Sequence, residues 1–315
     1  MLAVRSFIPR IRGTLAASGQ RVAHLGDFLL ESGEHIKNCQ VGYRTFGRLN
    51  PSKSNAVILT PWFQGTSAQL AWQIGPGKLV DSSKYFVIAV DAFGNGTSSS
   101  PSNSGAQPGA GFPSFTIRDI VESQFWLVTR VFGLTHLMGA VGISMGGMQV
   151  FQWMTAYPDF MDKAVSIVGS PQTQPDDRTR WERDIANLQA HSAWTRGWQA
   201  LLQAKPRTVL HELRIKPYDH ARQGQAIMTF DIAAPFGGSM TRAAATMRAE
   251  LLVAGTWADR EVNPQPAFEL ARMVKAEVLE LDGRCGHQAP SCEQKTLWRA
   301  VGRFLSGHRD NVVHS

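Results

Sequence analysis

The sequence predicts an α/β fold in which a mostly parallel sheet is covered by helices on both faces. Short, continuous apolar runs rich in β-forming residues recur along the chain, and amphipathic helical patterns lie between several of them. A strand buried on both faces is continuously apolar, which is typical of parallel sheets. The 315 residues, 43% of them hydrophobic, suffice for one large α/β domain or two modest ones.

Seven runs bounded by turn residues are expected to form the strands. They are Val41–Phe46, Asn55–Thr60, Tyr85–Val90, Leu137–Ile143, Ala164–Val168, Leu251–Ala254 and Val278–Leu281. Helices are expected at Thr116–Val131, Gly146–Tyr157 and Ser291–Leu305, where apolar residues recur at three- and four-residue spacings. Strands that alternate with helices favour a parallel sheet with both faces covered.

One segment, residues 172–249, breaks this alternation. It contains tryptophans and several helix-like stretches but few strand signals. We expect residues 27–171 and 250–315 to form the core domain, with residues 172–249 as a short helical cap. Such a cap would cover the C-terminal edge of the sheet, where α/β proteins build their active sites.

The charge of the chain is concentrated at its start. The formal net charge is +7, and the first 26 residues contain Arg5, Arg10, Arg12 and Arg21 but no acid. Residues 1–26 are therefore interpreted as a basic N-terminal extension, and their composition is also that of a transit peptide. Elsewhere no lysine-rich tract or aromatic–basic ladder indicates a nucleic-acid partner.

Two further observations concern the compartment. No apolar run approaches the roughly 20 residues that cross a bilayer, so a membrane-spanning protein is not expected. The cysteines Cys39, Cys285 and Cys292 are too few and too scattered for a disulfide scaffold, which favours a reducing compartment. The prediction is a cytoplasmic protein, with organellar import as the alternative if the N-terminal extension is a transit peptide.

The strongest motif is Gly142-Ile143-Ser144-Met145-Gly146, which connects a predicted strand to a predicted helix. The pattern G-x-S-x-G in this context is a nucleophile elbow, a sharp turn from which the serine hydroxyl projects. The N-terminus of the following helix would direct N–H groups toward an oxyanion. Ser144 is therefore the expected nucleophile. The alternative is a glycine-rich turn with an incidental serine.

A serine nucleophile needs a histidine base, and the histidine needs a carboxylate that orients it. His287 is the one histidine of nine that lies between the last predicted strand and the last predicted helix. Asp259 follows the preceding strand and is the expected acid, which gives the chain order serine, acid, histidine. Asp282 is the rival, although its place on the same loop as His287 is better suited to capping a turn.

The loop Pro61–Thr66 follows an early strand and is expected to complete an oxyanion hole. The backbone N–H groups of Phe63 and Met145 are the predicted donors, and the side chains of Trp62 and Gln64 are expected to shape the substrate pocket. No cofactor or metal is expected. A metal site at Cys285, His287 and Cys292 would have three ligands and would remove His287 from catalysis, so these cysteines are interpreted as small core residues.

These residues resemble homoserine O-acetyltransferases and their relatives within the α/β-hydrolase fold. Further matches are Ile74-Gly75-Pro76-Gly77-Lys78, Tyr85-Phe86-Val87-Ile88, Phe112-Pro113, Thr116-Ile117-Arg118-Asp119 and Ser144-Met145-Gly146-Gly147-Met148-Gln149. The resemblance implies an α/β-hydrolase fold with Ser144, Asp259 and His287 as its triad and with Phe63 and Met145 at the oxyanion positions. It also implies a ping-pong reaction through an acyl-serine, and it suggests a homodimer.

The chain departs from this family near the acceptor site. Ile143 stands where the transferases usually have glycine, and residues 61–65 are bulkier than the family's loop. The segment whose arginine the family is expected to use on the amino-acid carboxylate is not found. We therefore expect hydrolysis of a small ester or amide. The alternatives are a homoserine-type O-acetyltransferase with acetyl-CoA as co-substrate, and a catalytically silent scaffold used for binding.

Overall fold

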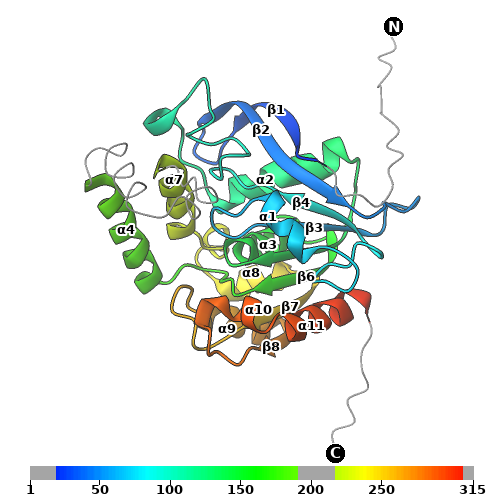
Figure 1. Cartoon of the computed structure of the whole chain (residues 1–315). Coiled ribbons are helices and arrows are strands. Elements are labelled where there is room, and N and C mark those ends of the chain that lie inside the picture. The colour runs from blue at the N-terminus through cyan, green and yellow to red at the C-terminus, as the bar shows by residue number, and fades with distance from the viewer. Residues whose placement is uncertain (1–18, 191–216, 308–315) are drawn as a thin grey trace, which may run out of the picture.

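The computed structural model describes residues 19–190 and 217–307, which contain one eight-stranded sheet in the order β1-β2-β4-β3-β5-β6-β7-β8 (Figure 1). The strands are β1 Arg21–Leu29, β2 His35–Phe46, β3 Ala56–Thr60, β4 Phe86–Val90, β5 Leu137–Ile143, β6 Met161–Ile167, β7 Glu250–Gly255 and β8 Glu277–Glu280. The predicted α/β class is confirmed. All seven predicted runs lie in or overlap a strand of this sheet.

Most of the sheet is parallel. The pairs β4–β3, β3–β5, β5–β6, β6–β7 and β7–β8 are parallel, whereas β1–β2 and β2–β4 are antiparallel. Every residue of β3 is buried, as expected for a strand covered on both faces. The carboxyl ends of the parallel strands therefore meet at one edge, where the loops after β3, β5, β7 and β8 come together.

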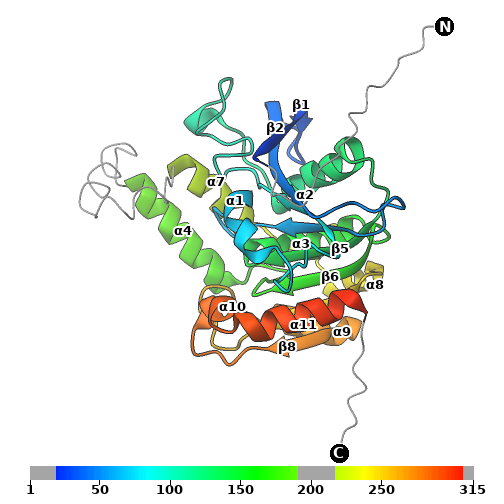
Figure 2. The ribbon, with the colours of Figure 1, turned by 45° about the vertical axis from the view of Figure 1, so that its right-hand side comes forward.

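Helices cover both faces of the sheet (Figures 1 and 2). The α-helices of the described residues are α1 Ser67–Leu70, α2 Ile117–Trp126, α3 Met145–Ala156, α4 Pro175–Ala190, α7 Pro217–Met228, α8 Met240–Thr246, α9 Gln265–Val274, α10 Ala289–Cys292 and α11 Gln294–Ser306. One hydrophobic cluster joins the sheet to α2, α3, α8 and α9. A second cluster on the other face includes residues of α1 and α11.

The first strand was not predicted, and it shifts the boundary of the N-terminal extension. β1 begins at Arg21, so residues 21–26, which the sequence analysis placed in the extension, pair with β2. Only Ala23 and Phe28 of this strand are buried, and its register is interrupted around Gly26. An exposed, irregular edge strand has no continuous apolar run, which explains why the pattern was missed.

In the sequence, helices α4, α7 and α8 come after β6 and before β7, within the predicted cap. Helix α4 packs against α7 to one side of the sheet, whereas α8 contacts α3 and α9 of the core (Figure 1). Residues 191–216 of the predicted cap and residues 1–18 of the predicted extension lie outside the described residues. The division into core and cap stays a prediction.

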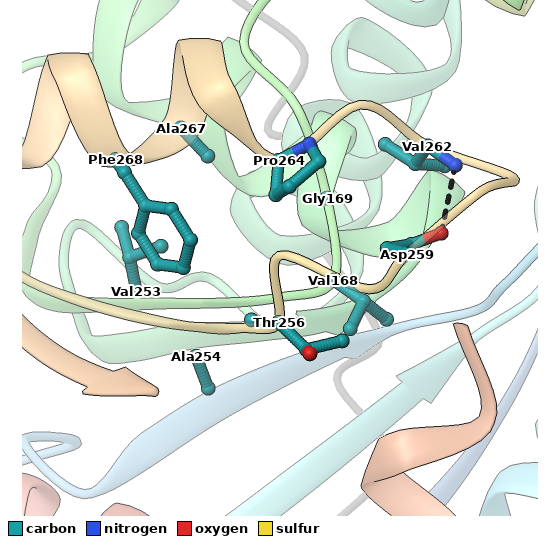
Figure 3. A pocket seen from close by; sticks show the side chains of 11 residues that line it. Val168, Gly169, Val253, Ala254, Thr256, Asp259, Val262, Pro264, Ala267 and Phe268 are labelled. Atoms are coloured by element: carbon teal, nitrogen blue, oxygen red, sulfur yellow. Dashed lines mark hydrogen bonds between the residues drawn. The ribbon is translucent and has the colours of Figure 1, made fainter. Parts of the chain in front are cut away.

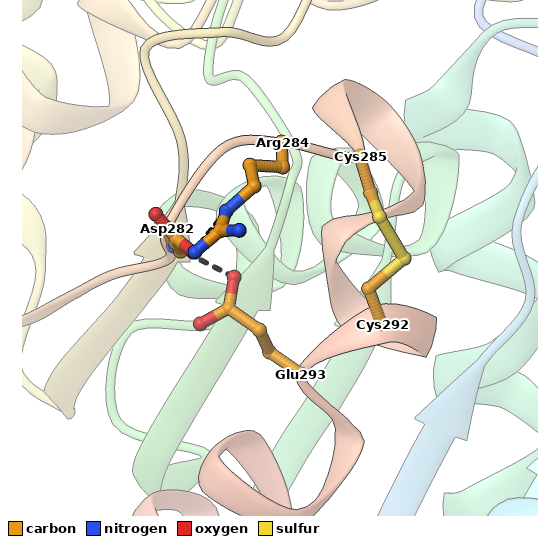
Figure 4. Close-up of a disulfide and its surroundings, with 5 residues drawn as sticks. All are labelled: Asp282, Arg284, Cys285, Cys292 and Glu293. Atoms are coloured by element: carbon orange, nitrogen blue, oxygen red, sulfur yellow. Dashed lines mark hydrogen bonds and ion pairs between the residues drawn. A yellow bond between two sulfur atoms is a disulfide. The ribbon is translucent and has the colours of Figure 1, made fainter.

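The cysteines differ from the expectation. Cys39 is a free, fully buried cysteine in β2. Cys285 and Cys292, interpreted as small core residues, are instead exposed and form a disulfide with a Cα–Cα distance of 6.6 Å (Figure 4). The turn between them brings two sulfurs together that are seven positions apart in the sequence. Cysteine usage therefore no longer favours a reducing compartment. Residues 19–190 and 217–307 contain no cluster of three or more side chains suited to a metal.

Within the same described ranges, no helix combines the length and the apolar character that crossing a bilayer requires.

Candidate active site

Ser144 stands at the sharp turn between β5 and α3. Its backbone has φ 58° and ψ −120°, a conformation that L-residues rarely adopt and that surrounding contacts must enforce. The Ser144 N–H donates to the carbonyl of Ile167 on β6, and the Ser144 carbonyl accepts from Met148 in the first turn of α3. The serine is therefore held between the sheet and the helix, as expected for a nucleophile elbow.

The glycines of this motif are required by close backbone approach. A Cβ atom at Gly142 would overlap the carbonyl group of Gly146, and one at Gly146 would overlap the carbonyl group of Thr60 on β3. The Thr60 hydroxyl also donates to the Gly146 carbonyl at 2.9 Å. Side chains at either glycine would force the turn apart, so the motif has a steric cause in this fold.

Asp259, His287 and Ser144 form one hydrogen-bonded row. Nε2 of His287 lies 2.9 Å from Oγ of Ser144, and Nδ1 lies 2.7 Å from Oδ2 of Asp259. The exposed fractions of the His287 and Asp259 side chains are 10% and 2%. In the tautomer protonated at Nδ1, the imidazole donates to the carboxylate and accepts from the hydroxyl. The structure thus brings together the three side chains that the sequence singled out.

The carboxylate of Asp259 is fixed by its own loop. Oδ1 accepts from the backbone N–H groups of Glu261 at 2.8 Å and Val262 at 3.0 Å, which leaves Oδ2 for His287. Figure 3 shows Asp259 and Val262 beside a small cavity of about 10 Å³ that is also lined by Phe268. A space of that size holds at most one water, so it serves no substrate.

Asp282, the rival acid, has its hydrogen-bond partners outside this row. Its carboxylate accepts from Nε of Arg284 at 2.9 Å, and its backbone N–H donates to Oε1 of Glu293 at 2.7 Å (Figure 4). The Asp282 side chain is 57% exposed. Its contacts are those of a residue that stabilises the turn, as the sequence analysis expected of the less favoured candidate.

The two predicted oxyanion donors are both available. Met145 is the first residue of α3, so its N–H has no carbonyl partner within the helix. Phe63 lies in the loop after β3. Among the hydrogen bonds of the described residues, neither amide donates to a protein acceptor.

A cavity of about 400 Å³ opens over the serine. It is lined by Trp62, Phe63, Trp72, Gln73, Ile143, Ser144, Glu261, His287, Gln288, Pro290 and Ser291. Trp62 is part of this wall, and its contact with a substrate stays a prediction. The described part of the wall has one acidic side chain, Glu261, and neither lysine nor arginine.

Comparison with known proteins agrees with this geometry. A family model described as alpha/beta hydrolase fold matches residues 64–210. An acetylester hydrolase from Corynebacterium glutamicum superimposes with a TM-score of 0.78 at 24% identity, covering 90% of this chain and 96% of that one. The acetyl esterase MekB superimposes with a TM-score of 0.79 at 25% identity, covering 92% and 97%. The chain has the α/β-hydrolase fold.

Sequence relatives fall into two groups. The ethyl acetate hydrolase of Pseudomonas veronii is 39% identical over 156 residues, which are 49% of this chain and 45% of that protein. The homoserine O-acetyltransferase of Methanococcoides burtonii is 38% identical over 168 residues, 48% of this chain and 34% of that protein. The alignments span less than half the length of these curated relatives. The chain is thus related to both acetyl esterases and homoserine O-acetyltransferases.

Gln64, which was also predicted to shape the pocket, is not among the residues that line the cavity over Ser144. It adopts a positive φ of 57°, and its side chain turns away from the cavity toward Gly94 and α7. Its backbone N–H and Nε2 both donate to Oε1 of Gln223, at 2.8 and 2.9 Å, and Nε2 also donates to the Gly94 carbonyl. Gln223, fully buried on α7, donates in turn to the Phe93 carbonyl at 2.6 Å.

Gln223 is therefore a residue that the sequence analysis missed. It fastens the loop that carries Phe63 to α7 and to the loop after β4. The Phe63 loop, α7 and the loop after β4 are far apart in the sequence but meet at the amide group of Gln223. No local sequence pattern predicts such a contact. Only the helical character of the segment around Gln223 was foreseen.

Two aromatic side chains, Trp181 and His220, also pack against Phe63 and support its loop. The ring centroids of Trp181 and His220 each lie 4.6 Å from that of Phe63. Nδ1 of His220 is buried without a hydrogen-bond partner among the described residues. Burial lowers the pKa of His220, although the nearby Asp184 charge acts in the opposite direction. The neutral imidazole thus packs as an aromatic neighbour of Phe63.

Proposed function

We propose that this α/β-hydrolase is a serine-dependent acyl-transfer enzyme that hydrolyses a small ester or amide through a covalent acyl-serine. The observation that carries the proposal is the hydrogen-bonded row from Asp259 through His287 to the Ser144 hydroxyl, at 2.7 and 2.9 Å. It has the connectivity that activates a serine: nucleophile to base, and base to orienting carboxylate.

The proposed reaction has two halves. Nε2 of His287 takes the Ser144 proton while Oγ attacks the acyl carbon, and the developing oxyanion accepts from the N–H groups of Phe63 and Met145. The intermediate collapses as His287 gives the proton to the leaving oxygen or nitrogen, which departs as an alcohol or amine. His287 then deprotonates a water that attacks the acyl-serine, and the carboxylic acid leaves as Ser144 regains its proton.

The cavity supports a small, neutral acyl substrate. Its volume of about 400 Å³ lies at the small end of ligand pockets, and Trp62, Phe63 and Ile143 provide apolar wall. The described wall offers no lysine or arginine to pair with a substrate carboxylate, and the Glu261 carboxylate would repel it. The names of the relatives, ethyl acetate hydrolase and acetylester hydrolase, are consistent with an ester of a short acid.

A second candidate is an O-acetyltransferase that moves the acetyl group from acetyl-CoA to an alcohol. The relationship to homoserine O-acetyltransferases favours it, and the same acyl-serine would serve both reactions. Only the acceptor differs. In this case acetyl-CoA would be a co-substrate, and no other cofactor is invoked.

A fluorophosphonate probe with Ser144→Ala as the matched control tests the proposal. We expect labelling of the wild type, none of the variant, and a loss of turnover on short-chain p-nitrophenyl esters on the order of 10⁴–10⁶-fold. Folded wild-type protein that takes no label and turns over no ester would instead indicate a silent scaffold.

A second experiment tests whether water or an alcohol accepts the acyl group. The enzyme is incubated with acetyl-CoA, with and without L-homoserine, and O-acetylhomoserine and free acetate are both measured. We expect ester hydrolysis to exceed transfer. O-acetylhomoserine formation faster than hydrolysis would select the transferase.

A further inference from the structure

The Cys285–Cys292 disulfide encloses the segment that carries His287. The two cysteines are seven positions apart, and His287 lies two residues after the first of them. Three other enclosed residues, Gln288, Pro290 and Ser291, line the cavity over Ser144. One covalent bond thus spans the proposed base and part of one pocket wall.

The second cysteine joins this segment to a rigid element. Cys292 ends α10, two residues before α11 begins at Gln294. Helix α11 is held in the core by Leu297, Val301 and other buried apolar side chains. The disulfide therefore ties the turn at Cys285 to a helix that packs on the sheet.

The backbone hydrogen bonds next to His287 span only a few residues. The N–H of Gly286 donates to the Gly283 carbonyl at 3.0 Å, and the N–H of Gln288 donates to the Cys285 carbonyl at 3.0 Å. Gly283 and Gly286 both have positive φ, 86° and 52°, so the backbone turns sharply twice just before His287. These two bonds shape the turn, but they do not reach α11. At the start of the turn, the Asp282 N–H donates to Oε1 of Glu293, the N-cap of α11, at 2.7 Å. The disulfide adds a covalent link on the side of the turn that carries His287.

We propose that the Cys285–Cys292 disulfide is a positioning element for His287, which holds the imidazole at hydrogen-bond distance from Ser144. This inference rests on the proposed serine mechanism. A displacement of about 1 Å at a catalytic group reduces turnover by as much as 10²-fold. Loosening the turn would therefore slow proton transfer while the nucleophile and the carboxylate stay in place.

The bond is accessible to a reagent. Cys285 and Cys292 are both exposed, whereas Cys39 is fully buried, and burial raises the pKa of the Cys39 thiol to about 12. A dithiol such as dithiothreitol supplies two electrons and two protons to the disulfide. The S–S bond breaks, two thiols form, and the reagent is oxidised to its cyclic disulfide.

The experiment compares oxidised wild type, dithiothreitol-reduced wild type and the double variant Cys285→Ser/Cys292→Ser on a p-nitrophenyl ester. We expect kcat to fall about tenfold or more in the reduced and double-variant forms, with a smaller change in KM. The rate of Ser144 labelling by the fluorophosphonate should fall in parallel. Reoxidation should restore the wild type, and the reductant should not change the double variant.

A purely stabilising role predicts something different. It would lower the melting temperature but leave kcat and the labelling rate at 25 °C unchanged, and that result would overturn the proposal. Thiol titration of the reduced wild type verifies that the bond was broken. Failure of the serine mechanism is recognised independently, because Ser144→Ala would then retain turnover in the oxidised protein.

Discussion

The hydroxyl oxygen of Ser144 lies 2.9 Å from Nε2 of His287, although 143 positions separate the two residues. The sheet produces this proximity. Ser144 follows β5, Asp259 follows β7 and His287 follows β8, and these parallel strands end at the same edge. Loops at the carboxyl ends of parallel strands are where α/β folds assemble sites.

The first prediction concerns the acid. Asp259→Asn retains the size of the side chain but removes the carboxylate that orients His287. We expect kcat to fall on the order of 10⁴-fold, because the imidazole then loses its correct tautomer. Steady-state kinetics on a p-nitrophenyl ester measures the effect, with circular dichroism to verify the fold.

Asp282→Asn is the matched control. This carboxylate is 57% exposed and bonds Arg284, so kcat should stay within about twofold of the wild type. If the two variants exchanged their effects, Asp282 would be the orienting acid and the assignment of Asp259 would be wrong.

The second prediction concerns the steric requirement at Gly146. A methyl group there overlaps the carbonyl group of Thr60, so β3 and the elbow must separate. We expect Gly146→Ala to lose about 1–3 kcal/mol of unfolding free energy and most of the Ser144 labelling. Urea denaturation and the fluorophosphonate probe measure the two effects.

Gly302→Ala is the control for that substitution. Gly302 lies within α11, and a Cβ atom there meets nothing within 4 Å. Alanine should stabilise the helix by about 0.5–1 kcal/mol and leave labelling intact. Equal behaviour of the two alanine variants would show that the close approach at Gly146 is relaxed at little cost.

Much of the fold was predictable from local patterns. Buried parallel strands such as β3 are continuous apolar runs, and the elbow ties Ser144 to the junction of β5 and α3. The chain order of serine, acid and histidine then selected Asp259 and His287. The edge strand β1 was not predicted, because most of its side chains are exposed and its pairing register with β2 is interrupted around Gly26.

The features that were not predicted, the orientation of Gln64 and the disulfide, depend on how separate segments meet in the fold. The orientation of Gln64 is set by Gln223, which lies 159 positions away, and no periodicity encodes that pairing. The pairing of Cys285 with Cys292 likewise depends on how the His287 turn meets α10. Two cysteines at this spacing are equally compatible with buried thiols until the turn geometry is known.

The third prediction concerns the fastening of the Phe63 loop. Gln223→Leu leaves the Gln64 N–H and the Phe93 carbonyl without their partner, and unsatisfied buried groups cost about 1–3 kcal/mol each. We expect lower stability in urea and a kcat reduced about tenfold, since the Phe63 amide loses its fixed position.

Gln225→Leu on the same helix is the comparison. Gln225 is half-buried, and its Oε1 accepts from Arg222, away from the Phe63 loop. Its kcat should match the wild type. A kcat loss of the same size in both variants would mean that damage to α7, and not the release of the loop, slows the reaction.

The fourth prediction concerns Glu261, which lines the cavity and is exposed. Two charges about 4 Å apart in water interact by about 1 kcal/mol, equivalent to roughly fivefold in a rate. Glu261→Gln should therefore raise kcat/KM for the anionic p-nitrophenyl hemisuccinate several-fold and leave p-nitrophenyl acetate unchanged. The gain should shrink at 0.5 M salt, because salt screens exposed charges.

Glu269→Gln makes the same charge change on the exposed side of α9, where the Glu269 carboxylate accepts from Gln265. An equal gain in that variant would assign the effect to net charge, and no gain in either would remove Glu261 from substrate selection. A gain confined to Glu261→Gln would identify this carboxylate as the group that disfavours acidic substrates, and would explain in physical terms why the cavity is better suited to a neutral ester than to an amino-acid acceptor.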